Sequence, residues 1–95
     1  MQCDVNCTAK VLKAIAHPLR LKLLCRLRDQ ELTVQELVSQ SGASQSNVSQ
    51  HLALLRHKGI VSTRRDASRI YYRIGDPKLL ALIMMMQDIY CQKAA

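Results

Sequence analysis

The segment at residues 33–57, TVQELVSQSGASQSNVSQHLALLRH, places the tightest limits on the fold of this chain. Its first four residues have the form of a capping box, in which Thr33 accepts the backbone N–H of Glu36 and the Glu36 carboxylate reaches back, so they predict a short helix. Gly42 can adopt the left-handed conformation that ends a helix, and Ser44 can cap a second, longer one. Two helices joined by a tight turn in this way form a helix-turn-helix pattern.

Two runs rich in β-forming residues follow, IVSTRRD at 60–66 and RIYYRI at 69–74. Each run alternates its side chains as a strand does, and the polar turn DAS joins them, so they predict a β-hairpin. Only Asp66 opposes the cations that gather here: Arg56, Lys58, Arg64, Arg65, Arg69 and Arg73. Such an excess, in a chain of net charge +7, is typical of proteins that bind nucleic acid, although charges on an edge strand also prevent aggregation.

Three further helices are expected, over residues 7–16, 18–28 and 77–91. Proline suits a first helical turn, and the residue before it avoids the α region, so the HP pair at 17–18 separates the first two. The last helix is apolar nearly all round, and we therefore expect a subunit interface to bury part of it. The predicted fold is mainly α with a β-hairpin wing: one winged helix-turn-helix domain over residues 1–95, with about five helices and two strands, that forms a homodimer.

Several classes of function are not expected. The longest apolar run, Leu79 to Met86, is too short to span a bilayer, and the N-terminal MQCDVNCTAK lacks the pattern of a secretory signal. We therefore expect a cytoplasmic protein without a membrane partner. The sequence has no glycine-rich phosphate loop, no metal triad and no paired carboxylates with a plausible pocket, so we expect neither an enzyme nor a cofactor. A pure dimerisation module would explain the last helix but leaves the basic hairpin without a role.

The helix that follows Ser44 begins with short uncharged donors and acceptors, which can bond to base edges and phosphates in the major groove of double-stranded DNA. The residues expected to make these contacts are Gln45, Ser46, Asn47, Ser49 and Gln50. The cations expected to lie along the DNA backbone or in the minor groove are Arg56, Arg64, Arg65 and Arg69. A polar helix alone could equally be a solvated face. A polar helix followed directly by a basic hairpin favours DNA binding.

The stretches SQSNVSQHLALLRHKGIVSTRRDASRIYYRI and LKAIAHPLRLKLL together resemble the ArsR/SmtB family of bacterial repressors. The resemblance implies a homodimer built on the first and last helices, an operator with two-fold symmetry, and release of DNA when an inducer binds. Ser46, Ser49 and His51 match the recognition-helix motif of that family. His51 could contact DNA directly, or it could be a core or hinge histidine.

Both familiar metal sites of the family are absent, because residues 33–35 hold no cysteine pair and the last helix holds no histidine. The segments LLC and YC, and a wing without its usual glycine, resemble the sulfur-responsive branch. That resemblance implies that Cys25 and Cys91 approach one another within a subunit and that persulfide or oxidant bridges them, which lowers DNA affinity. Cations near Cys25 in the sequence favour its thiolate, so we expect Cys25 to react first and Cys91 to resolve.

A rival inducer model uses the N-terminal thiols. Cys3 and Cys7 are four residues apart, so a helical N-terminus would place them on one face. Arsenite or a soft metal could bind there, with a further thiol from Cys91 or from the second subunit. The alternative is that both are incidental thiols of an N-terminal arm.

Overall fold

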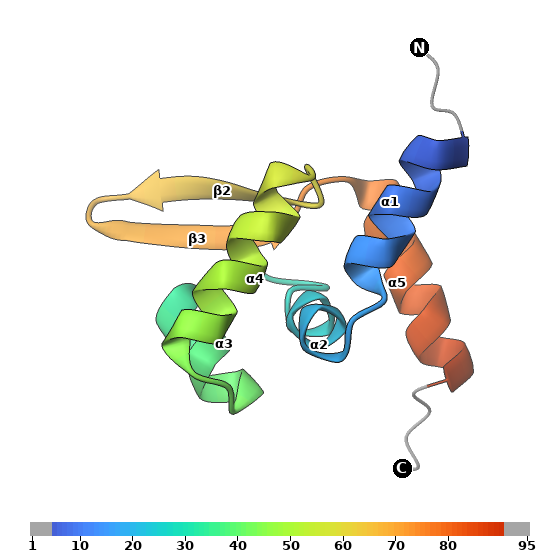
Figure 1. Cartoon of the computed structure of the whole chain (residues 1–95). Coiled ribbons are helices and arrows are strands. Elements are labelled where there is room, and N and C mark those ends of the chain that lie inside the picture. The colour runs from blue at the N-terminus through green and yellow to red at the C-terminus, as the bar shows by residue number, and fades with distance from the viewer. Residues whose placement is uncertain (1–4, 91–95) are drawn as a thin grey trace.

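The computed structural model describes residues 5–90, and within that range the chain forms five helices and three strands (Figure 1). The helices are α1 (Val5–Ile15), α2 (Pro18–Arg26), α3 (Val34–Ser41), α4 (Gln45–His57) and α5 (Pro77–Tyr90). The strands are β1 (Leu32–Thr33), β2 (Val61–Asp66) and β3 (Arg69–Ile74). This confirms the predicted mainly α fold with a hairpin wing. The two-residue strand β1 is an addition that the sequence did not predict.

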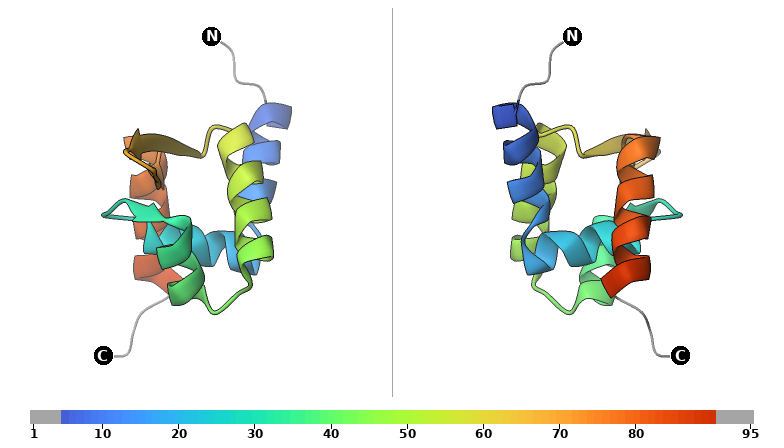
Figure 2. Two further views of the ribbon diagram at one scale, coloured as in Figure 1. Left: turned by 90° about the vertical axis from the view of Figure 1, so that its left-hand side faces the viewer. Right: turned by 90° about the vertical axis from the view of Figure 1, so that its right-hand side faces the viewer.

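Helix α2 forms the centre of the molecule, where it contacts α1, α3, α4 and α5. In Figure 1 it is seen nearly end-on among the other helices, and Figure 2 shows α1 and α5 on opposite sides of it. Its side chains Leu23 and Leu24 are buried, as is Leu27 directly after it. Leucine, isoleucine, valine and alanine make up the rest of the buried core: Ala14, Leu32, Leu37, Val48, Leu52, Leu55, Ile60, Val61 and Ile83.

The helix-turn-helix forms through the local signals seen in the sequence. The Glu36 backbone N–H donates to Thr33 Oγ1 at 3.2 Å, and the Thr33 N–H donates to Glu36 Oε1 at 2.8 Å, which completes the capping box. Gly42 ends α3 with a φ of 77°. The Asn47 N–H donates to the Ser44 hydroxyl at 3.2 Å and caps α4. The predicted start of α4 after Ser44 is therefore confirmed.

The start of α2 has a cap that the sequence did not reveal. The Nδ1 atom of His17 accepts the backbone N–H groups of Leu19 at 3.2 Å and Arg20 at 3.4 Å. Pro18 occupies the first helical position, as expected from the HP pair. Nδ1 acts here as an acceptor, so the His17 ring takes the role that a Ser or Asp side chain usually has at a helix N-cap.

The wing is a three-stranded antiparallel sheet in the order β1-β3-β2. Thr33 of β1 pairs with Tyr71, which joins the start of the helix-turn-helix directly to the wing. At the hairpin tip Asp66 pairs with Arg69, and Ala67 adopts a φ of 59° between them. Left-handed backbone costs a residue with a Cβ about 1–2 kcal/mol relative to its ordinary conformation, so the missing glycine leaves a strained turn.

Helices α1 and α5 lie at the end of the molecule opposite the wing tip (Figure 1), and both expose apolar side chains. Leu12 of α1 is 51% exposed and Ile89 of α5 is 60% exposed, whereas Ile83 of α5 is buried. Within residues 5–90, no helix combines the length and apolarity that crossing a bilayer would require.

Candidate nucleic-acid interface

Helix α4 has a buried face and an outer polar face. Val48, Leu52 and Leu55 are fully buried, and they fix the rotation of the helix about its axis. Every residue predicted to contact DNA through this helix, apart from His51, is exposed: Gln45, Ser46, Asn47, Ser49, Gln50 and Arg56. At about 100° per residue, Ser46 and Gln50 centre on the outer face together with Ala53, whose small side chain permits close approach of a partner.

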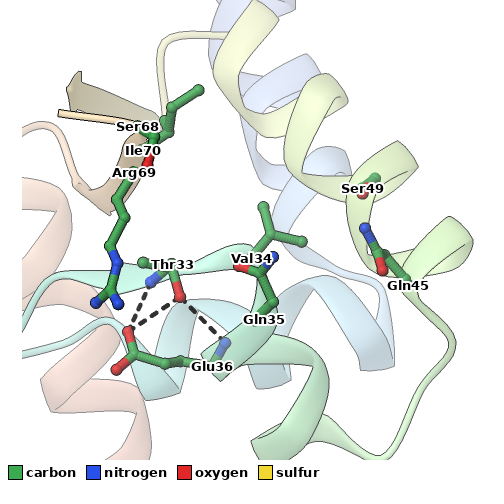
Figure 3. Close-up of a pocket in the computed structure, with 9 residues that line it drawn as sticks. All are labelled: Thr33, Val34, Gln35, Glu36, Gln45, Ser49, Ser68, Arg69 and Ile70. Carbon is green, nitrogen blue, oxygen red and sulfur yellow. Dashed lines mark hydrogen bonds between the residues drawn. The ribbon is translucent and has the colours of Figure 1, made fainter. Parts of the chain in front are cut away.

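A groove of about 670 Å³ lies between the helix-turn-helix and the wing tip (Figure 3). Gln45 and Ser49 line it from α4, and Ser68, Arg69 and Ile70 line it from the hairpin. The start of α3 completes the lining with Thr33, Val34, Gln35 and Glu36. The polar helix and the basic wing were predicted separately from the sequence. The groove joins them into one concave surface.

The three predicted wing arginines have different surroundings. Arg64 Nε donates to Glu31 Oε1 at 2.7 Å, its Nη1 lies 3.9 Å from Asp66 Oδ2, and its guanidinium lies 4.7 Å from the ring centroid of Tyr71. The hydrogen bond to Glu31 raises the pKa of Arg64 above its usual value. Within residues 5–90, neither Arg65 nor Arg69 forms an ion pair.

The register of the hairpin separates Arg64 from its neighbour Arg65. Arg64 pairs with Tyr71, so both lie on one face of the sheet, whereas Arg65 pairs with Ile70 on the other face. Arg69 and Ile70 both line the groove at the hairpin tip, although they lie on opposite faces of the sheet, and Arg65 is not part of the lining. In Figure 3 the Arg69 side chain extends toward the start of α3. Arg69 therefore offers its charge to a polyanion at the groove itself, and Arg65 is exposed on the adjacent strand.

The side chain of His51 faces α2 and not the outer surface. Its Nδ1 atom lies 3.2 Å from Arg20 Nη1, and its ring centroid lies 4.6 Å from that of His17. Since a guanidinium only donates, Nδ1 of His51 must be the acceptor. Partial burial lowers the pKa of His51, and the proximity of His17 and Arg20 lowers it further. Of the two roles considered for His51, this geometry favours the hinge histidine.

Among the four thiols, two lie within residues 5–90. Cys25 is half-buried on α2 and packs against the core, and Cys7 is exposed in the first turn of α1. Cys3 and Cys91 fall outside the described residues. Between residues 5 and 90 there is no cluster of three or more metal-ligating side chains.

The groove also contains a residue that reasoning from the sequence missed. Gln35 is exposed in the first turn of α3 and lines the groove beside Gln45. The capping box predicts where α3 begins, so Gln35 in its first turn could have been predicted from the sequence as a DNA contact. Which face of α3 meets the groove, however, depends on the pairing of β1 with β3, which the sequence did not reveal.

Comparisons with known proteins fit this architecture. The family model described as "Bacterial regulatory protein, arsR family" matches residues 17–63. The transcriptional activator HlyU of Vibrio cholerae is 45% identical over 82 residues, which cover 86% of this chain and 76% of HlyU. The biofilm growth-associated repressor of Xylella fastidiosa is 41% identical over 91 residues, which cover 96% of this chain and 80% of that protein.

Solved structures of related proteins also match the fold of this chain. One of HlyU from Vibrio cholerae matches with a TM-score of 0.88 at 41% identity, and it covers 97% of this chain and 100% of that chain. Another, of reduced HlyU from the same organism, matches with a TM-score of 0.85 at 42% identity and covers 92% of each chain.

Proposed function

Because this chain belongs to the ArsR family of bacterial regulatory proteins, we propose that it is a homodimeric repressor whose release from a two-fold symmetric DNA operator is triggered by a bridge between Cys25 and Cys91. Proteins of this family are transcriptional regulators and not enzymes, they bind DNA operators and they typically act as dimers. The bridge is formed by persulfide or oxidant.

The proposed DNA contacts come from the outer face of α4 and the tip of the wing. The major groove of B-DNA, about 12 Å wide, admits one α-helix, and short polar side chains there can read base edges. The proposed contacts from α4 are Gln45, Ser46, Asn47, Ser49, Gln50 and Arg56, and those from the wing are Arg65 and Arg69. Arg64 and His51 act indirectly, by holding the wing and α4 in position.

The proposed dimer interface uses the exposed apolar side chains of α1 and α5. On α5 the exposed residues Leu82, Met85, Met86 and Ile89 have the spacing i, i+3, i+4 and i+7, which is one face of a helix. Ile83 is buried on the other side of the same helix. An exposed apolar stripe of this kind marks a protein interface. The operator symmetry follows, since a two-fold symmetric dimer presents two copies of α4.

One hydrogen bond is the main support for Cys25 and Cys91 as the partners of the proposed bridge. Arg28 Nη1 donates to Gln87 Oε1 at 2.8 Å, which ties the end of α2 to the last turns of α5. Cys25 precedes Arg28 by three residues, and Cys91 follows Gln87 by four. A chain advances at most about 3.6 Å per residue, so three residues keep Cys25 within about 11 Å of Arg28 along the chain, and the sequence places Cys91 four residues after Gln87. The contact therefore supports a bridge within one subunit.

The proposed chemistry is thiol–persulfide exchange. The Cys25 thiolate attacks the terminal sulfur of a low-molecular-weight persulfide, forms a Cys25 persulfide and expels the carrier thiolate. The Cys91 thiolate then attacks the Cys25 sulfur and expels hydrosulfide, which leaves a disulfide. Two protein thiols are oxidised and the persulfide is reduced to a thiol and sulfide. Retention of the transferred sulfur in the bridge instead requires a second equivalent of persulfide as the oxidant.

Intact mass and DNA affinity test this proposal together. The protein is treated with cysteine persulfide, peroxide or arsenite, and binding is measured by fluorescence anisotropy on a duplex selected from a random pool. We expect persulfide to link Cys25 to Cys91 and to weaken binding by about 5- to 150-fold, the usual range of allosteric coupling. Cys25→Ser and Cys91→Ser should abolish the response, and the matched control Cys7→Ser should retain it.

The exposure of Cys7 favours metalloid sensing as a second candidate, because an accessible thiol in the first turn of a helix is reactive. In that case arsenic would be retained on Cys3 and Cys7, with a further thiol from Cys91 or the second subunit. Arsenite would then release DNA in the wild type but not in Cys7→Ser. Release by arsenite without a Cys25–Cys91 link would contradict the persulfide model.

A further inference from the structure

A second hollow lies away from the groove, between α1 and the C-terminal end of α4. Its volume is about 210 Å³. The residues that line it are Lys10, Lys13, Ala14, Arg20, Leu54 and Lys58. Four of these six side chains are cationic, and none is acidic.

Ordinary helix electrostatics explains only part of this set. Lys13 lies in the last turn of α1 and Lys58 caps the end of α4, where cations interact favourably with the helix dipole. Lys10 lies in the middle of α1, where that interaction is absent. Lys10 and Lys13 are three residues apart, so they share one face of α1 and repel each other. Their convergence with Lys58 concentrates three exposed positive charges at one hollow, which favours the binding of a negatively charged ligand there.

Arg20 gives the hollow a fixed cation. Its Nε donates to the carbonyl oxygen of Ala14 at 2.5 Å, and its Nη1 donates to Nδ1 of His51 at 3.2 Å. A guanidinium has five N–H donors in one plane, so donors remain for a ligand after these two bonds. Leu54 and Ala14 supply apolar surface for the lysine stems. The three lysines can thus close around an anion that Arg20 orients.

This hollow is distinct from the proposed DNA groove. The two share no lining residue. Gln45 begins α4 and Lys58 follows its end, which places them about 20 Å apart along a helix of this length. Figures 1 and 2 show α3 and the wing tip on one side of α4 and α1 on the other.

We propose that Lys10, Lys13, Lys58 and Arg20 form a phosphate-binding site. Ammonium groups bind phosphate as point charges, and an arginine fork adds directed hydrogen bonds. The phosphate belongs either to a small phosphorylated molecule or to the DNA backbone outside the major groove occupied by α4. Only the second source rests on the proposed function.

The experiment compares two double variants that lose the same charge. Lys13→Gln with Lys58→Gln removes two cations of the site, and Arg26→Gln with Lys78→Gln removes two exposed cations elsewhere. Inorganic pyrophosphate is titrated into each full-length protein by calorimetry and by backbone amide NMR. Binding to a mixed-sequence duplex is measured as a function of salt. Urea unfolding verifies that each variant is folded, and Lys13→Arg with Lys58→Arg should restore binding.

If the site serves free phosphates, the first variant should bind pyrophosphate at least about tenfold more weakly than the control, and the salt dependence of DNA binding should match the control. If it serves the DNA backbone, the slope of log K against log salt should shrink by about 0.9 for each phosphate that the variant no longer neutralises, beyond any change in the control. Equal behaviour of the two variants in both assays would overturn the site. Absence of salt-dependent DNA binding by the wild type would instead contradict the proposed function. The pyrophosphate titration alone would then show whether the phosphate-binding site exists.

Discussion

Arg64 and Arg65 are neighbours in the sequence, but Arg64 forms ion pairs with Glu31 and Asp66, whereas Arg65 forms none within residues 5–90. We expect Arg65→Ala to weaken binding to every duplex and to reduce the salt slope by about 1 for each subunit. Arg64→Ala should leave that slope nearly unchanged, since Glu31 and Asp66 already neutralise this guanidinium. Anisotropy titrations over a range of salt concentrations distinguish the two variants.

Matching slopes for the two variants would mean that Arg64 leaves Glu31 when DNA binds. In that case Glu31→Gln, which removes the competing carboxylate, should strengthen DNA binding by the wild-type wing. If Glu31 only holds Arg64 in place, as we expect, the same substitution should loosen the wing and leave the slope unaltered.

The sequence could not have separated these two arginines. Strand alternation places adjacent side chains on opposite faces, but it does not say which face meets the groove. The partner of Arg64 is Glu31, which lies 33 residues earlier. A contact across that separation depends on the whole fold. The polar residues of α4 were predictable because Val48, Leu52 and Leu55 mark its buried face at helical spacing.

At the scale of elements, the contact between α2 and α4 contains a titratable group. The pKa of His51 is lowered in the folded state, so the unfolded chain binds the proton more tightly. The contribution of His51 to the free energy of unfolding is therefore fully present above its unfolded-state pKa of about 6.5. That contribution is lost as the pH falls through the folded-state pKa. We expect the free energy of unfolding to decrease over this range, by no more than about 1.4 kcal/mol per pH unit for one proton.

His51→Gln tests this expectation, because its amide oxygen can still accept from Arg20 while it cannot titrate. Urea unfolding measured from neutral to acidic pH should show a smaller slope for this variant than for the wild type. His57→Gln is the matched control on the exposed end of the same helix. An unchanged slope in His51→Gln would contradict the assignment of the pH dependence to His51.

The elements that the sequence predicted best are those whose signals are local. The cap at Thr33, the stop at Gly42 and the cap at Ser44 each depend on residues within one helical turn. The first helix begins earlier than predicted, at Val5 instead of Cys7. The strand β1 was missed because its two residues become a strand only by pairing with Tyr71 and Tyr72.

At the scale of the whole molecule, one side of α5 belongs to the core and the other belongs to the proposed subunit interface. Its inner side packs against the single core through Ile83, while Ile89 is 60% exposed on the outer stripe. We expect Ile89→Asp to dissociate the homodimer and to leave the subunit folded, because a charge at an interface core loses its hydration without a partner. Analytical ultracentrifugation measures the mass, and circular dichroism reports the helix content. Ser39→Asp, an exposed change on α3, is the matched control.

The same variant should lose operator affinity far more than it loses general DNA affinity. In a dimer the second α4 binds at high effective concentration once the first is in place, which raises affinity by about 10²- to 10⁴-fold. A monomer keeps its basic wing, and so its salt-dependent binding to any duplex, but it loses that gain. A dimer that survives Ile89→Asp would place the subunit interface elsewhere. It would also separate the Arg28–Gln87 contact on α5 from the element that joins the two half-sites.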